Sequence, residues 1–99
     1  MLWPGVQALP YEHSAPLRFQ LALALALQDQ PETSEALLMQ VIELDPGFAE
    51  AWICLSNCQQ TLGRLQAAAK SLSHVATLKP EIAGWCAREA EVLQSRAKR

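Results

Sequence analysis

The sequence predicts an all-α fold in which antiparallel helical hairpins stack as a short α-solenoid. The 99 residues are rich in Ala and Leu and contain only four Gly, so helix propensity exceeds strand propensity throughout. Pro46 and Pro80 lie 34 residues apart, and each closes a helical apolar pattern. A period of this length indicates repeated helix-turn-helix units that bury their apolar faces by stacking. Six pairs recur at this interval: Ala15/Ala49, Leu21/Leu55, Ser34/Ala68, Leu38/Leu72, Val41/Val75 and Leu44/Leu78.

The first 14 residues are predicted to form an irregular apolar arm ahead of the repeats. Pro4 and Pro10 preclude one continuous helix in this segment. Its apolar content exceeds that of a solvated tail, and the side chains concerned are Leu2, Trp3, Val6, Leu9 and Tyr11. We therefore expect a repeat domain over residues 15–99, preceded by an arm over residues 1–14.

The first helix is expected from about Ser14, a potential N-cap, to about Asp29, with Pro16 in its opening turn. Between Phe19 and Leu27, large and small residues alternate as in a half-buried strand. We reject the strand because Leu and Ala are strong helix formers and no second strand is available for pairing. The alternation instead indicates a helix that is apolar on every side and needs cover on more than one face.

Two further helices follow, each with a recognisable boundary. The second is expected from near Pro31 to Asp45, where Pro46 follows. The third should span residues 48–62 and end at Gly63, because glycine most readily adopts the left-handed conformation that terminates a helix.

The fourth helix should cover residues 66–78, and Pro80 then opens a fifth helix that carries Trp85. The fifth helix ends in a basic tail, which suits a helix C-terminus. No partner helix follows it, so we interpret it as a capping helix. The expected divisions are repeat one at residues 15–48, repeat two at residues 49–82 and the capping helix at residues 83–99.

Charge and hydropathy narrow the classes of partner. The net charge is −2, and no basic stripe interrupted by aromatic residues occurs, so we expect no nucleic-acid partner. The longest apolar run, Leu21–Leu27, is too short to span a membrane, and we expect no membrane partner. The N-terminus lacks the cationic start and cleavage site of a secretory signal. These features predict a cytoplasmic protein.

The cysteines do not suggest a disulfide framework or a metal site. Their number is three, and an odd count favours a reducing compartment. Cys54 and Cys58 lie one helical turn apart, but a zinc site needs two more ligands. Cys86, His74 and His13 come from separate segments without motif spacing. We therefore expect no metal and no cofactor, with the cysteines serving as small packing residues.

No catalytic motif is evident. The sequence has no Ser or Cys nucleophile with His and acid partners at motif spacing, and its glycines are too dispersed to form a phosphate-binding loop. We expect that the protein is not an enzyme and that its function depends on binding.

The segment from Trp52 to Pro80 resembles the tetratricopeptide repeat family. That family follows the pattern W-x2-L-G-x2-Y, then A-x3-F, then P. The matches are Trp52, Leu55, Ala68 and Pro80, and the replacements are Ser56 for Gly, Gln59 for Tyr and Leu72 for Phe. A more degenerate copy covers residues 15–48, with Arg18 at the Trp position.

The resemblance implies a protein–protein interaction module that acts as an adaptor or a chaperone-like holder. In this family, the first helices of successive repeats line a concave groove that takes a peptide or helix of a partner protein. The matching positions on the first helix are Pro16, Phe19, Leu23, Ala26 and Leu27. Those on the third helix are Glu50, Ile53, Asn57, Gln60 and Thr61. Of the residues that clamp a terminal carboxylate in some members, only Asn57 is present, so we expect no such clamp.

Several alternatives stay open at this point. Asn57 could bond between neighbouring helices, and the arm could fold back over Phe19 and Leu23. The same apolar face could instead serve a homo-oligomeric structural protein, or the chain could belong to a longer repeat array. Two repeats and a cap fall below the roughly three repeats usually needed for stability, so a partner, a second copy or the arm should complete the core.

Overall fold

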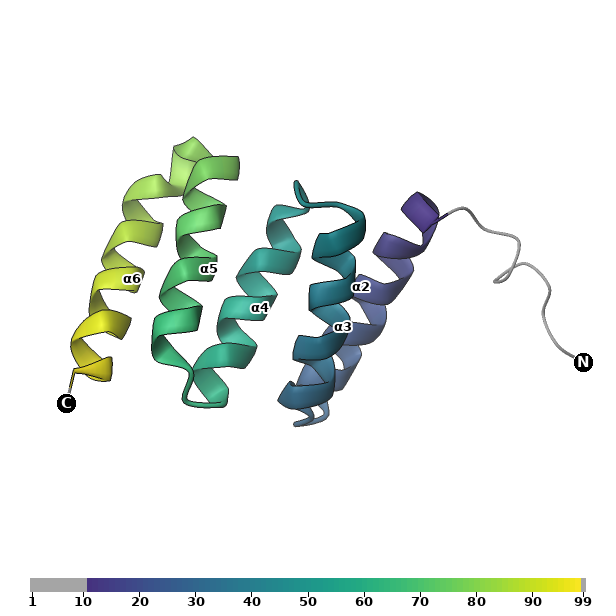
Figure 1. Cartoon of the computed structure of the whole chain (residues 1–99), viewed down its shortest axis with the longest axis horizontal. Helices are drawn as coiled ribbons and strands as arrows, with labels where there is room; N and C mark the ends of the chain where they lie inside the picture. The colour runs from purple at the N-terminus through teal and green to yellow at the C-terminus, as the bar shows by residue number, and fades with distance from the viewer. Residues whose placement is uncertain (1–10, 99) are drawn as a thin grey trace, which may run out of the picture.

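The computed structural model describes residues 11–98, and the side chains of residues 15–98, as a row of antiparallel helices without strands (Figure 1). The elements are α2 (Tyr11–Leu27), α3 (Pro31–Leu44), α4 (Ala49–Thr61), α5 (Leu65–Leu78), a 3-10 turn (Pro80–Ile82) and α6 (Ala83–Ala97). Each helix packs mainly on the next one in the chain, with α2 and α6 at the two ends of the row. The prediction of an all-α helical-repeat solenoid is confirmed.

The start of the first helix differs from the sequence-based expectation. Helix α2 begins at Tyr11, so Ser14 lies inside the helix and the prediction that it forms the N-cap is wrong. Pro16 is also interior to α2. The fixed φ of proline suits a helix, and near the helix end its missing N–H removes only one hydrogen bond. Of the predicted arm, residues 1–10 lie outside the described part of the chain.

Single residues determine the turns between helices. Gly63 has a φ of 79° and ends α4 in the left-handed conformation, as predicted. Asp29 adopts a similar φ of 62° after α2, in a region where Asp is tolerated better than most side chains. Before α4, the Asp45 carboxylate accepts a hydrogen bond of 3.2 Å from the Gly47 N–H. These three turns reverse the chain and produce the antiparallel packing.

The core consists of two hydrophobic clusters joined by one aromatic residue. The first cluster lies among α2, α3 and α4, and the second lies between α5 and α6. Trp52 packs against both clusters. Its indole Nε1 donates to the Pro46 carbonyl oxygen at 3.0 Å, and its ring stacks on His74 with centroids 4.1 Å apart. Trp52 therefore connects Pro46, near the end of the predicted repeat one, to the second cluster.

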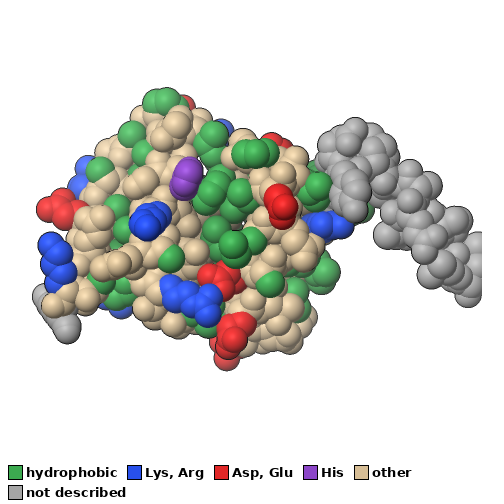
Figure 2. Space-filling view, in the orientation of Figure 1, with side chains coloured by type: hydrophobic (Ala, Val, Ile, Leu, Met, Phe, Trp, Pro, Cys, Tyr) green, Lys and Arg blue, Asp and Glu red, His purple; other side chains and the backbone are tan. Residues whose placement is uncertain are grey.

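Most pairs that recur at the 34-residue interval have the same burial. Leu38 and Leu72 are both buried, as are Val41 and Val75. The remaining pairs behave likewise, apart from Leu21 and Leu55, which are treated below. On the face seen in Figure 2, hydrophobic side chains gather over α3 and α4, whereas most Lys and Arg side chains lie over α5 and α6.

Candidate functional site

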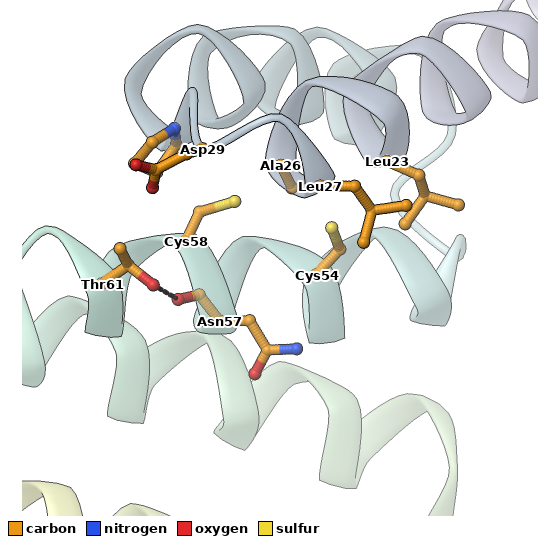
Figure 3. Close-up of a pocket in the computed structure, with 9 residues that line it drawn as sticks. Leu23, Ala26, Leu27, Asp29, Cys54, Asn57, Cys58 and Thr61 are labelled. Atoms are coloured by element: carbon orange, nitrogen blue, oxygen red, sulfur yellow. Dashed lines mark hydrogen bonds between the residues drawn. The ribbon is translucent and has the colours of Figure 1, made fainter.

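A cavity of about 380 Å³ lies between α2, the turn that follows it, and α4 (Figure 3). Its lining residues are Leu23, Ala26, Leu27, Asp29, Pro31, Cys54, Asn57, Cys58 and Thr61. The cavity is open to solvent and lies between α2 and α4, the first helices of the two predicted repeats. It therefore occupies the position at which the sequence suggested a groove.

Helix α2 supplies an apolar wall at the end of its last turns. Ala26 and Leu27 lie three and four residues after Leu23, which places both of them next to Leu23 on the helix surface. Leu23 and Ala26 are half-buried because they also pack on the first core cluster. Leu27, the last residue of α2, is 88% exposed. This wall therefore offers apolar surface that no described residue covers fully.

Helix α4 supplies the opposite wall, which is mixed in character. Asn57 and Thr61 are exposed, and the Thr61 hydroxyl donates to the backbone oxygen of Asn57 at 3.1 Å. Figure 3 shows the Asn57 side chain directed away from Leu27 and α2. Its amide makes no bond to a neighbouring helix among the described residues. The amide is therefore free to donate and accept hydrogen bonds at the edge of the cavity.

Two buried thiols form the floor of the cavity on the α4 side. Burial and the neighbouring Cys58 raise the pKa of Cys54 to about 11. The Cys58 thiol donates to the Ser34 hydroxyl at 3.4 Å, and Ser34 in turn donates to the Ala22 carbonyl at 2.7 Å. The Cys54 thiol is therefore protonated near neutral pH.

The geometry offers no metal centre within the described residues, where no group of three His, Cys, Asp or Glu side chains converges. Cys86 lies in the second core cluster, far along the row of helices from the cavity. Burial raises its pKa as well. All three cysteines are packed as small buried residues.

Five of the ten residues proposed from the sequence line this cavity, namely Leu23, Ala26, Leu27, Asn57 and Thr61. The others lie elsewhere. The Phe19 ring packs on Phe48 with centroids 4.8 Å apart, and Ile53 packs against the second core cluster. Gln60 donates to the Ser56 hydroxyl at 3.4 Å. Glu50 and Pro16 are exposed outside the cavity.

Sequence reasoning did not assign Asp29, Pro31, Cys54 or Cys58 to this surface. The spacing of four between the cysteines was a usable signal, because it places both thiols on the same side of α4 as Asn57 and Thr61. Asp29 gave no such signal. Its carboxylate reaches the rim because the left-handed turn after α2 brings it there.

Two sequence profiles described as tetratricopeptide repeat match residues 15–48 and 37–70. Together they span residues 15–70, which is more than half of the chain. The chain belongs to the tetratricopeptide repeat family. The second match begins within α3 and continues through α4. The two matches to this tetratricopeptide repeat protein therefore overlap at residues 37–48.

Repeats of this family generally mediate protein–protein interactions, and the family is typically non-catalytic. No curated protein matches the sequence of this tetratricopeptide repeat protein. Among its described residues, every helix is too short or too polar to traverse a lipid bilayer.

Proposed function

We propose that this tetratricopeptide repeat protein holds a peptide or helix of a partner protein in the groove between α2 and α4, as an adaptor or a chaperone-like holder. The observation that carries this proposal is the cavity itself, which combines an apolar wall at Leu23 and Leu27 with the free amide of Asn57. Ligand sites in proteins commonly pair an apolar lining with a few convergent polar groups.

The charge of the lining residues restricts the ligand. The cavity has one acidic group, Asp29, and no Lys or Arg among the residues that line it. A terminal carboxylate would therefore find no cation. We propose a partner segment that places an apolar side chain against Leu27 and a basic side chain towards Asp29, while its backbone bonds to Asn57.

The free energies of typical contacts indicate that the bound segment must contribute more than one side chain. Burying a single Leu-sized side chain contributes roughly 1.5–3 kcal/mol. Each hydrogen bond to the backbone adds about 0.5–1.5 kcal/mol. Micromolar affinity needs about 8 kcal/mol, so a partner segment must engage the groove with several residues.

A second copy of the chain is the alternative occupant of the same groove, and the high exposure of Leu27 is the observation that favours it. In that case the protein would be a homo-oligomeric assembly protein. Light scattering after size exclusion, over a micromolar concentration range, measures the mass of the protein and so distinguishes binding of a partner protein from self-association. A monomer supports heterologous binding, whereas an oligomer that Leu27→Glu dissolves supports self-association.

The binding test is a selection of phage-displayed random peptides on the full chain. We expect selected peptides to be rich in apolar and basic residues, and Leu27→Glu to weaken their binding at least tenfold. Asn57→Ala should weaken it several-fold without loss of helicity. Met39→Glu is the matched control, because Met39 is also an exposed apolar residue but lies on α3 outside the cavity. Equal binding to the parent and to Leu27→Glu would refute the proposed groove.

The proposed cellular setting is the cytoplasm. The three cysteines are free and buried, which suits a reducing compartment. The proposed role requires binding alone, so no catalytic group or cofactor enters it.

A further inference from the structure

The buried faces of α4 and α6 give these two helices the same register against the helix that precedes each of them. The buried face of α4 packs in the first core cluster, and that of α6 packs in the second. Each α6 residue lies 35 positions after its counterpart on α4, one more than the repeat period. The three pairs are Ala51 and Cys86, Leu55 and Ala90, and Cys58 and Leu93.

The same interval places two exposed residues of α6 at groove positions. Val92 takes the position of Asn57, and Arg96 takes the position of Thr61. On α2, 34 residues earlier, these positions hold Leu23 and Leu27. Helices α2, α4 and α6 run in the same direction along the row, so equivalent positions line up across them (Figure 1). We call these lines the groove rows, and they consist of Leu23, Asn57 and Val92, and of Leu27, Thr61 and Arg96.

The surroundings of Arg96 agree with this register. Arg96 and Gly63 border a hollow of about 530 Å³ between the end of α4 and the end of α6. The other cation that lines the hollow, Arg64, is paired with Glu35, whereas Arg96 makes no ion pair or hydrogen bond with a described residue. No Asp or Glu lines the hollow. An acidic side chain of a ligand would therefore find an unpaired cation there.

The two ends of the groove carry opposite charge. At the α2 end, Asp29 lines the cavity and has no ion-pair partner among the described residues. The wider charge distribution has the same polarity. Residues 15–62 carry six acidic side chains and one basic side chain, whereas residues 63–98 carry six basic and three acidic side chains. Such a field orients a charged partner before it makes contact.

We propose that the partner segment carries its own charges in a fixed order along the groove, with a basic side chain at Asp29 and an acidic side chain at Arg96. This inference rests on the proposed function, because it describes the ligand of the same groove. Val92 is 53% exposed and offers a second apolar contact beyond Leu27. The segment therefore has two apolar anchors, which is consistent with the need for several contacting residues.

The separation of the helices determines how far apart the two charges lie in the segment. Helix α2 touches α4, and both α4 and α6 pack on α5. Because helices in contact lie about 8–10 Å apart, the path from α2 across α4 to α6 measures about 20–30 Å. An extended chain advances roughly 3.3 Å per residue, so the basic and acidic residues should lie about six to nine positions apart.

The test uses synthetic copies of the phage-displayed peptides selected on the full chain, with binding measured by fluorescence polarisation. Arg96→Glu should weaken binding at least tenfold. Lys98→Glu is the matched control, because it makes the same change of charge on the same helix but borders a different hollow, beside Gln66 and Gln94. It should change binding less than twofold. Circular dichroism should report the same helicity for both variants as for the parent.

A charge exchange identifies which end of the groove each charge meets. Replacing the acidic residue of the peptide by Lys should restore binding to Arg96→Glu at least tenfold, but not to Asp29→Lys. Replacing its basic residue by Glu should restore binding to Asp29→Lys and not to Arg96→Glu. Rescue of either variant by both peptides would show a general charge effect and would overturn the inference.

The remaining outcomes separate this inference from the proposed function. If Leu27→Glu weakens binding tenfold while Arg96→Glu binds as the parent does, the groove between α2 and α4 stands and the charge order is overturned. If no peptide is selected, the proposed function fails and this inference fails with it. If the parent is an oligomer that Arg96→Glu dissolves, the charged ends serve a second copy, and the partner segment is overturned.

Discussion

The Ser34 hydroxyl donates to the carbonyl oxygen of Ala22 at 2.7 Å, where α3 crosses α2. In the second repeat, the Ser56 hydroxyl donates to the carbonyl oxygen of Ala68 at 3.2 Å, where α4 crosses α5. The interval of 34 pairs Ser34 with Ala68 and Ala22 with Ser56, so the serine and the alanine have exchanged helices between repeats. All four are fully buried. Each crossing therefore needs one hydroxyl and one methyl, and either helix can supply the hydroxyl.

The size of the side chain at this crossing should matter more than its hydrogen bond. We expect Ser56→Leu to lower the free energy of unfolding by about 2 kcal/mol or more, because the added volume has no space between α4 and α5. Ser56→Ala should cost about 1 kcal/mol, the typical net value of one hydrogen bond. Urea denaturation followed by circular dichroism measures both. Ser95→Leu on exposed α6 surface is the control and should change stability by less than about 0.5 kcal/mol.

Trp52 should be the most sensitive of the described tryptophans. Trp52→Phe removes the hydrogen bond to Pro46 and weakens the stack on His74, and we expect a loss of about 1–2 kcal/mol. Trp85 is 42% exposed, so Trp85→Phe should cost less than about 0.5 kcal/mol. Thermal and urea unfolding of the two variants provide the comparison. Equal losses would contradict the role of Trp52 in joining the two core clusters.

Gly63 should tolerate alanine poorly although there is space for the methyl group. A Cβ at Gly63 would meet nothing within 4 Å, but the φ of 79° is strained for any residue with a Cβ. We expect Gly63→Ala to cost about 1–2 kcal/mol. Gly47→Ala is the matched control, since its Cβ would make an ordinary 3.6 Å contact with Asp45 and its φ is not positive. Its stability should stay within about 0.5 kcal/mol of the parent, as measured by urea unfolding.

The Cys54 thiol should make stability fall in alkaline solution. Its pKa rises from an ordinary 9.0 to about 11 in the folded chain, so the unfolded state loses the proton first. The stabilising contribution is complete below pH 9 and is lost as the pH rises towards 11, by roughly 2–3 kcal/mol in total. Urea midpoints measured from pH 7 to 11 should fall more steeply for the parent than for Cys54→Ala. Parallel curves would show that the thiol is not shielded as described.

The same burial predicts that the Cys54 thiol, which lines the groove, reacts slowly with thiol reagents. At pH 8 the Cys54 thiolate is scarce, so its reaction with an aromatic disulfide reagent should be at least a hundredfold slower than that of a free thiol. Addition of urea should restore the ordinary rate.

The helices and their order were predictable from the sequence because their signals are local. Helix propensity, the prolines at 46 and 80, and the need for a left-handed residue at Gly63 all act within a few residues of the chain. The 34-residue period then identified the stacking of like units. The start of α2 was misplaced because a proline in a helix and a potential N-cap serine give competing local signals.

The groove was predictable only in outline. Asn57 and Ile53 both belong to the helix face inferred from the sequence, yet only Asn57 lines the cavity, because Ile53 packs towards the second core cluster. Asp29 reaches the rim through the direction of a turn. Side-chain spacing defines which residues share a helix face, but the angle at which two helices pack decides which of them border a cavity.

Leu21 and Leu55 show most clearly which properties the sequence determines and which the tertiary structure determines. They are the same residue type at the same position of the repeat, and the sequence by itself determined that both lie on helices of one repeated unit. Only the tertiary structure decided that Leu55 is buried and Leu21 is exposed. The physical reason is that a helix carries its apolar faces along its own sequence, whereas the burial of each face requires a neighbour that the helix itself does not specify.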